Sequence, residues 1–285
     1  MYYKLGNTSI EINMPEDMII PQNMNKFVSK ENKSDHKYNI NFTDNLKSVV
    51  DEFLLSHKID KEIRRENMLI IISGIIELRI IWIIRTNVPY AVTIEDEYKT
   101  FVWVDKWIRN NLTSDTIFGS LLSLEKRVIK NNCLILHSAY ILKDNKAILF
   151  TAPSGTGKST QAELWEKYRG ARIINGDKAL LSYDEKGWYA NGWPICGSSE
   201  ICNNESYPIK AIVVIEQSKD NKVSVLSEIQ AFKKLTSEVT INMWNKDFQN
   251  KAFDLIGKLI EDVLVYKLNC NISKDAVECL ANAMK

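Results

Sequence analysis

Residues 146–160 read KAILFTAPSGTGKST, an apolar run that passes into a glycine-rich turn and ends on Lys-Ser-Thr. Gly155 and Gly157 allow left-handed backbone conformations that turn several N–H groups toward one anion. The amphipathic pattern of residues 161–168 predicts a helix that begins near Lys158 and adds its positive N-terminal end. The stretch therefore predicts a buried strand, a phosphate-binding loop and a helix, in that order.

The expected ligands of this loop are ATP and Mg²⁺. Lys158 would reach the β- and γ-phosphates, and the Ser159 hydroxyl would ligate a magnesium ion between them. The usual pattern opens with Gly, whereas this chain has Ala152, so the start of the loop has to accommodate a Cβ. A glycine-rich turn without a ligand is the alternative. The residues expected to hold the nucleotide are Ser154, Gly155, Thr156, Gly157, Lys158, Ser159 and Thr160.

The composition is that of an ordinary soluble protein, with 45% hydrophobic and 26% charged residues in a chain of 285. The 37 Lys and Arg nearly balance the 36 Asp and Glu, which gives no support to a nucleic-acid or membrane partner. Five scattered cysteines without a C-x-x-C pair disfavour a disulfide framework and a zinc site, and the N-terminus lacks a signal-peptide pattern. A cytoplasmic protein is expected, and a homo-oligomer is an open alternative.

The chain divides into a β-rich N-terminal module, residues 1–112, and a nucleotide-binding domain, residues 113–285. The apolar run 68–84 is long enough to suggest a membrane span, but Glu77 and Arg79 near its centre favour strands. The module is expected to pack against the nucleotide-binding domain and to bind the acceptor or a partner. Strands are predicted at 1–13, 37–42, in a meander over 68–104, and at 133–137, 146–151, 172–177 and 210–216. Helices are predicted from Ser114, and over 227–235, 246–261 and 273–283.

Asp177 ends the predicted strand 172–177 and lies 19 residues after Lys158, where phosphate-loop proteins place a carboxylate near the metal. It would ligate Mg²⁺, directly or through water, or accept the proton of an attacking hydroxyl. The triplet 175–177, Asn-Gly-Asp, also favours a turn, so capping of that turn is the alternative role.

His137 closes the strand 133–137, and the short turn at 143–145 should bring that strand beside the phosphate-loop strand. A histidine at this position faces either the core or the phosphates. A lone histidine at a strand end is more often structural than functional.

The run from His137 to the phosphate loop, with Lys158 lying 21 residues on, resembles the core of HPr kinase/phosphorylase. The resemblance implies an α/β fold with a mixed sheet, related to phosphoenolpyruvate carboxykinase, and places His137 near the transferred phosphoryl group. In that family an Asp-Asp pair follows: the first is the general base toward the target serine and the second aids the metal. Asp177 matches the first, whereas Lys178 stands in place of the second, so either fewer carboxylates hold the metal or Glu200 or Glu205 substitutes.

The chain is more similar to the HPr-kinase-like proteins found with ribosomal-peptide maturation enzymes, including the lasso-peptide kinases. They share the histidine, the Asn-Gly-Asp triplet and the Trp-Pro-x-x-Gly segment at 193–197, and the resemblance covers roughly residues 115–285. The Arg- and Gly-containing signature of true HPr kinases is not visible around Pro194, so HPr itself is not the expected substrate.

The sequence therefore predicts an enzyme: an ATP-dependent kinase that phosphorylates a Ser or Thr hydroxyl of a peptide or small protein, such as a ribosomal precursor peptide. Its expected catalytic residues are Asp177, His137 and Lys158, and its metal ligands are Ser159 and Asp177. A nucleotide-gated binding protein with little transfer activity and a small-molecule kinase are the alternatives. The aromatic residues Trp188, Tyr189, Trp193 and Tyr207 would line a base or peptide pocket, or belong to the core.

Overall fold

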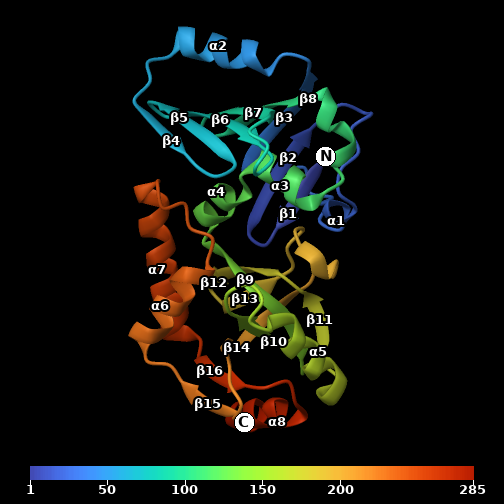
Figure 1. The fold of residues 1–285 in the computed structure, drawn as a ribbon, viewed down its shortest axis with the longest axis vertical. Helices are drawn as coiled ribbons and strands as arrows, with labels where there is room; N and C mark the ends of the chain where they lie inside the picture. The colour runs from blue at the N-terminus through green and yellow to red at the C-terminus, as the bar shows by residue number, and fades with distance from the viewer. The chain divides into compact units, whose positions relative to one another are not determined.

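The computed structural model describes residues 1–285 except the side chain of Ser198, and it divides into two compact units (Figure 1). The first unit comprises Met1–Lys4 and Thr8–Arg127, and the second comprises Leu5–Asn7 and Val128–Lys285. Each unit contains its own mixed sheet with helices packed on it.

The first unit is built on an eight-stranded sheet in the order β1-β2-β3-β8-β7-β6-β5-β4. Its strands are β1 (Tyr2–Leu5), β2 (Thr8–Asn13), β3 (His36–Thr43), β4 (Lys61–Arg64), β5 (Met68–Ser73), β6 (Ile76–Trp82), β7 (Pro89–Glu95) and β8 (Lys99–Asp105). Its helical segments are α1 (Gln22–Asn25), α2 (Leu46–Ser56), η1 (Lys106–Asn111), α3 (Asp115–Leu122) and α4 (Leu124–Val128, whose last residue falls in the second unit). The predicted meander over 68–104 is confirmed as the antiparallel strands β5 to β8. Residues 1–13 form two strands, separated by a turn at Gly6 with a left-handed backbone.

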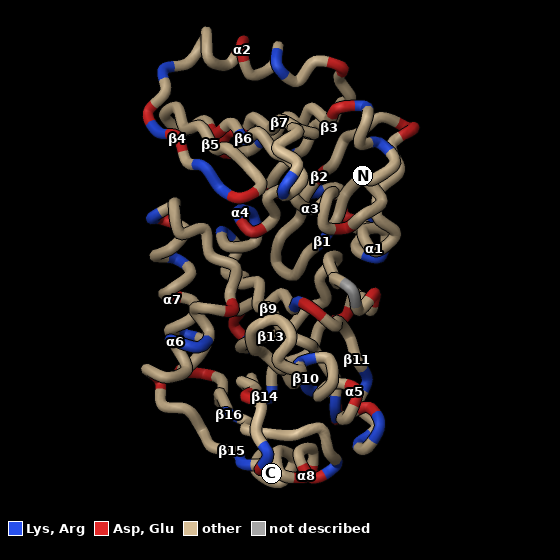
Figure 2. Tube along the Cα trace, viewed as in Figure 1, with Lys and Arg blue, Asp and Glu red and all other residues tan. Residues whose placement is uncertain are grey.

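The apolar run 68–84 forms strands, as predicted. Glu77 and Arg79 lie on β6, and both side chains are buried in the first unit. Across the described residues, none of the helices has the length and apolar character needed to cross a membrane. Acidic and basic residues are distributed along both units (Figure 2).

Buried ion pairs hold the segment after residue 112 to the first sheet, which is why this unit extends to Arg127. Lys126 Nζ lies 2.9 Å from Glu77 Oε2 and also contacts Glu95. Arg127 pairs with Glu95 across the same cluster, and Arg79 Nε donates to Glu77 Oε1 at 2.5 Å. Because these side chains are withdrawn from water, each charge depends on its partner in the cluster.

We predict that Glu95→Ala lowers the free energy of unfolding of the first unit by about 3–5 kcal/mol, because it leaves the buried Arg127 without its carboxylate. Asp44→Ala is the matched control: it removes an ion pair with Lys106 whose side chains are 72% and 58% exposed, and should cost about 0–1 kcal/mol. Urea unfolding followed by circular dichroism measures both. Equal, small losses for the two variants would show that the cluster does not hold this segment.

The second unit is built on strands in the order β10-β9-β12-β13-β14-β16-β15, with β11 paired to β9. Its strands are β9 (Cys133–Lys143), β10 (Lys146–Thr151), β11 (Arg172–Asn175), β12 (Lys178–Asp184), β13 (Gly187–Asn191), β14 (Ser206–Gln217), β15 (Lys222–Val225) and β16 (Val265–Cys270). Its helical segments are η2 (Ile129–Asn131), α5 (Lys158–Arg169), η3 (Gly197–Ser199), α6 (Glu228–Glu238), α7 (Lys246–Asp262) and α8 (Lys274–Ala283). The pairing of β10 with β14 closes a ring through β9, β12 and β13.

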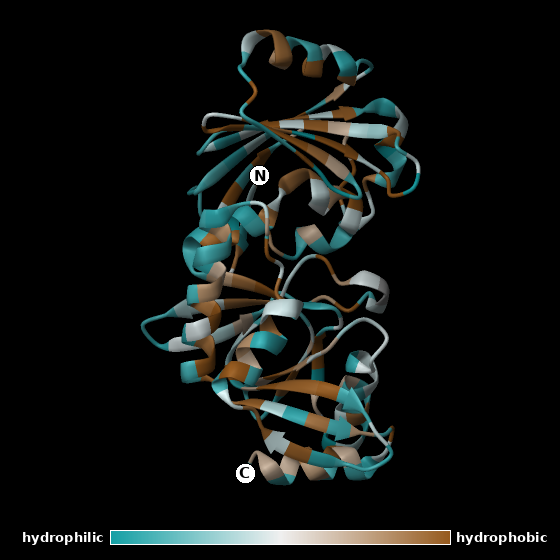
Figure 3. Ribbon diagram, turned by 60° about the vertical axis from the view of Figure 1, so that its left-hand side comes forward, coloured by the Kyte–Doolittle hydropathy of each residue, from teal (hydrophilic) through white to brown (hydrophobic). Residues whose placement is uncertain are grey.

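Two hydrophobic cores lie on the two faces of β10, because successive side chains of a strand point to opposite faces. Ala147 and Leu149 pack in the core formed with α6 and α7, whereas Ile148 and Phe150 pack in the core formed with α5 and α8. The hydrophobic residues are concentrated on the strands (Figure 3). β10 is therefore covered on both faces, and only the edge at its carboxyl end is left for the loop that follows it.

Candidate phosphate-binding and catalytic site

The loop between β10 and α5 has the conformation that the sequence predicted. Gly155 and Gly157 have φ values of 77° and 114°, in the left-handed region that favours glycine. α5 begins at Lys158 and ends at Arg169, and Gly170, which caps it, also has a left-handed φ. Ala152 is not among the residues with positive φ, so its Cβ is accommodated without backbone strain.

Lys158 lies in the hollow of this loop. Its Nζ donates to the carbonyl oxygen of Ala152 at 2.9 Å and to that of Pro153 at 3.4 Å. Burial lowers the pKa of Lys158, and the negative charges of Glu238 and Asp177 oppose that shift. A buried ammonium group held by the loop in this way is suited to binding phosphate oxygens.

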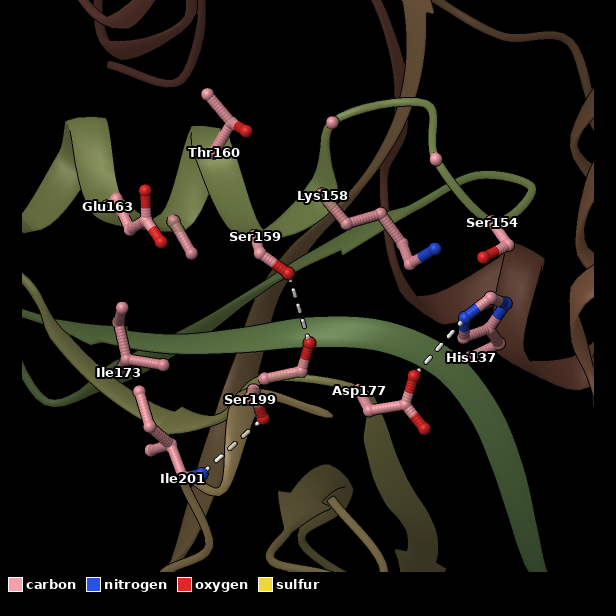
Figure 4. A pocket seen from close by; sticks show the side chains of 14 residues that line it. His137, Ser154, Lys158, Ser159, Thr160, Glu163, Ile173, Asp177, Ser199 and Ile201 are labelled. Carbon is pink, nitrogen blue, oxygen red and sulfur yellow. Dashed lines mark hydrogen bonds and ion pairs between the residues drawn. The ribbon is translucent and has the colours of Figure 1, made fainter. Parts of the chain in front are cut away.

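His137 is fixed beside the loop by the pairing of β9 with its neighbours. The Thr151 hydroxyl at the end of β10 donates to the His137 carbonyl oxygen at 2.8 Å, and Ser138 N–H donates to the Asp177 carbonyl oxygen at 2.9 Å. His137 Nε2 lies 3.4 Å from Asp177 Oδ1, and the two side chains point toward each other below Lys158 (Figure 4). The structure thus places His137 on the cavity side of its strand and not in the core.

The turn before β12 is held by Asn175 and not by Asp177. Asn175 Oδ1 accepts from the N–H groups of Asp177 at 2.9 Å and Lys178 at 3.0 Å, and its Nδ2 donates to the Trp193 carbonyl at 2.8 Å. The Asp177 carboxylate is therefore not used by the turn. The hydrogen bond from His137 is the main reason that the pKa of Asp177 is lowered; burial opposes the shift, and Lys178 and Lys158 add to it.

Gly197, the last residue of the Trp-Pro-x-x-Gly segment, closes against the Asp177 carboxylate. A Cβ built on Gly197 would lie 3.1 Å from Asp177 Cγ, and its φ of 56° is left-handed. A side chain here would push on the carboxylate as well as strain the backbone. This gives the glycine of the segment a physical role at the site.

Glu238 is a site residue that the sequence analysis did not find. It is the last residue of α6, and its Oε2 lies 3.2 Å from His137 Nδ1. The chain after α6 pairs with β9: Val239 bridges Leu136, and Thr240 N–H donates to the Ile135 carbonyl oxygen. Because Glu238 is 101 residues from His137, no local pattern in the sequence connects the two.

Neither acidic residue expected to replace the missing second Asp lies in the cavity. Glu205 pairs with Arg172, with Nη1 to Oε1 at 2.5 Å, and accepts a hydrogen bond from Tyr207. Glu200 is exposed and does not line the cavity. Lys178, at the position of that Asp, is in register with His137 on the neighbouring strand.

Of the two roles left open for the aromatic residues, the structure favours the core for the tryptophans. Trp188 and Trp193 are 4% and 2% exposed and belong to the interior, and Trp188 Nε1 donates to Asp262. Tyr189 is half-buried in β13, opposite Ser182. Tyr207 bonds to Glu205. None of these aromatic residues lines the cavity beside the loop, so they act as packing residues.

One cavity of about 450 Å³ brings most of the predicted site residues together. Its lining residues are His137, Ser154, Gly155, Gly157, Lys158, Ser159, Thr160, Ala162, Glu163, Ile173, Gly176, Asp177, Ser199 and Ile201. Of the predicted residues, only Thr156 lies outside it, and the Thr156 carbonyl oxygen accepts from Gln217 instead.

The lining fits a magnesium triphosphate. The Ser159 hydroxyl, which donates weakly to the Gly176 carbonyl oxygen at 3.5 Å, and the Asp177 carboxylate would be its ligands from the protein. Within the described part of the chain, no cluster of three or more His, Cys, Asp or Glu side chains forms a metal cage. Mg²⁺ typically takes only one or two carboxylates and completes its shell with phosphate oxygens and water.

Comparison with known proteins finds a matching family and similar solved structures. A family model described as SynChlorMet cassette protein ScmC matches residues 105–284. The chain is similar to the structure of the Hpr(Ser) kinase/phosphatase from Coxiella burnetii, with 10% sequence identity over 52% of this chain and 95% of that chain, and a TM-score of 0.30. Among curated proteins, no similar sequence is found.

We predict that Asn175→Ala lowers the free energy of unfolding of the second unit by about 1–3 kcal/mol, because two N–H groups lose their acceptor and the buried Trp193 carbonyl keeps only the weak Cys202 thiol donor. Asp184→Ala removes a similar side-chain hydrogen bond, to Lys186 N–H, in an exposed turn at the other end of β12 and should change stability by less than about 0.5 kcal/mol. Thermal and urea unfolding of the two variants measure the difference. A loss for Asn175→Ala no larger than that of the control would contradict the role assigned to Asn175.

Proposed function

The chain belongs to the family of SynChlorMet cassette protein ScmC, and we propose that it is a Mg-ATP-dependent kinase acting on a Ser or Thr hydroxyl of a peptide or small protein. The observation that carries the proposal is the convergence of Lys158, Ser159, Asp177 and His137 on one cavity beside a phosphate-binding loop. This set supplies what phosphoryl transfer requires: positioned phosphates, a metal ligand and a base.

In this proposal Asp177 accepts the proton of the acceptor hydroxyl. The hydroxyl oxygen then forms a bond to the γ-phosphorus while the bond from that phosphorus to the β-γ bridging oxygen breaks, and ADP leaves. The lowered pKa of Asp177 keeps its carboxylate ionised near neutral pH, so that it can take the proton. Lys158 and the loop N–H groups hold the charge on the phosphate oxygens, and Mg²⁺, when bound, neutralises charge between the β- and γ-phosphates.

His137 has a positioning role in this scheme. Its two ring nitrogens face Asp177 and Glu238 at 3.4 and 3.2 Å, so an imidazole protonated on both nitrogens donates to both carboxylates. The Glu238 side chain is only 10% exposed, which limits competition from water. Held in this way, His137 would fix the orientation of Asp177 toward the acceptor.

A nucleotide-gated binding protein is the second candidate, and one observation favours it: Lys178 stands where related kinases place a second carboxylate. Such a protein would hold ATP and bind its partner without transferring phosphate. Incubation with γ-labelled ATP, Mg²⁺ and Ser- or Thr-bearing peptides encoded by neighbouring genes separates the two. Label on a peptide hydroxyl supports the kinase, whereas ATP-dependent peptide binding without label would replace it with the binding protein.

We predict that Lys158→Ala weakens Mg-ATP binding by about 10- to 100-fold, because it removes charge-assisted hydrogen bonds to the phosphates worth about 1.5–3 kcal/mol. Lys167→Ala removes an exposed lysine from the same helix and should leave binding unchanged. Isothermal titration calorimetry measures both. Equal ATP affinity of Lys158→Ala and the unchanged protein would contradict the assignment of the loop.

We predict that Asp177→Asn keeps Mg-ATP affinity within a few-fold but lowers the rate of transfer at saturating ATP by about 100-fold or more, the typical effect of losing a positioned base. Asp184→Asn, at the other end of β12, should alter neither quantity. If Asp177→Asn instead abolishes Mg-ATP binding and leaves a normal rate at saturation, Asp177 acts only as a metal ligand and the role of base is contradicted.

A further inference from the structure

A second cavity, of about 510 Å³, adjoins the phosphate-binding loop on the side of β14. Glu238, whose carboxylate contacts His137, is among its lining residues. β10 has β9 on one side, which carries His137, and β14 on the other, which contributes to this cavity. The two cavities share only Ser154 and Gly155, the tip of the loop. A ligand that spans this tip would occupy both.

The second cavity lies at the carboxyl ends of two parallel strands. β10 and β14 pair in parallel from Ile148 to Thr151, so both chains leave the sheet at the same edge. The crevice outside the carboxyl ends of such strands is where open α/β sheets bind nucleotides. Gln217, the last residue of β14, donates from Nε2 to the Thr156 carbonyl oxygen at 3.3 Å and so ties the loop to this side.

The lining of the second cavity differs in chemistry from that of the first. Its apolar part is formed by Ala152, Pro153, Val214 and Ile215, a surface suited to the flat face of a heterocyclic base. The Glu216 carboxylate lies at the rim of the cavity. It pairs with Lys234 at 3.0 Å and with Lys267 at 2.7 Å, and these two ion pairs fix its position. The lining therefore combines an apolar wall with a fixed polar rim.

We propose that the second cavity is the nucleoside subsite of this protein, so that a nucleoside triphosphate lies across the tip of the loop. The inference rests on the proposed function, because it takes the triphosphate as the ligand of the loop. The γ-phosphate then lies in the first cavity with His137 and Asp177, and the base and ribose lie against Val214 and Ile215. The rest of the first cavity, which includes Glu163, Ile173 and Ile201, is left for the acceptor.

A cavity-filling substitution tests this assignment. Ser237 lies on α6, is exposed, lines the second cavity, and uses its hydroxyl only to bond the Lys234 carbonyl oxygen of its own helix. Ser237→Trp should therefore fill the cavity without disturbing the fold, and Ser237→Leu is a milder variant if it does not fold. Lys233→Trp is the matched control, because Lys233 is exposed on the same helix and does not line the cavity.

The affinities of each protein for Mg-ATP and for inorganic tripolyphosphate with Mg²⁺ are compared by calorimetry. Ser237→Trp should weaken ATP binding by about tenfold or more and leave tripolyphosphate binding within about twofold, while Lys233→Trp changes neither. An unchanged ATP affinity of Ser237→Trp, or equal losses for both ligands, would overturn the subsite. If the unchanged protein binds neither Mg-ATP nor tripolyphosphate, the proposed function itself is contradicted. This result differs from the two results that would contradict only the nucleoside subsite.

Discussion

Two hydrogen bonds in the middle of β9, at His137 and Ser138, connect the three parts of the candidate site. Thr151 at the end of β10 donates to the His137 carbonyl oxygen, and Ser138 donates to the Asp177 carbonyl oxygen. They fasten the strand that carries the histidine between the phosphate-binding loop and the turn that carries the carboxylate. Both acceptors are backbone carbonyl oxygens, and the donors are the Thr151 hydroxyl and the Ser138 N–H group. Together with the pairing of β9 and β10, these bonds fix the backbone of His137 relative to the loop.

One charge beside His137 is unfavourably placed in its own helix. Glu238 ends α6, where no basic residue in the last turn balances it and where the helix dipole disfavours an acid by about 0.3–1 kcal/mol. The contact of Glu238 with His137 offsets this cost only if the imidazole donates to it. An acidic residue at the C-terminal end of a helix lowers stability. Such a departure from the locally favoured residue type is expected at functional sites, and Glu238 lies beside the cavity.

The sequence predicted those parts of the molecule that local patterns specify. The glycine-rich turn, the strand before it and the helix after it follow from glycine spacing and the apolar pattern, and the structure confirms the conformation of all three. Glu238 could not be predicted, because α6 reaches β9 only through tertiary contacts such as the bridge between Val239 and Leu136. Trp188 and Trp193 were ambiguous for a related reason: cores and ligand pockets draw on the same residue types, and burial decides between them only in three dimensions.

The central claim is that His137, Lys158, Ser159 and Asp177 form a single site for a metal-bound triphosphate. The most direct measurement replaces Mg²⁺ with paramagnetic Mn²⁺ and follows the ring signals of His137 by NMR. The chain has three histidines, so the His137 signals are assigned as those that disappear in the His137→Gln variant. The account predicts that Mn-ATP strongly broadens the His137 ring signals, whereas Mg-ATP shifts them without broadening. Sharp, unshifted His137 signals in protein saturated with Mn-ATP would place the metal elsewhere and contradict the account.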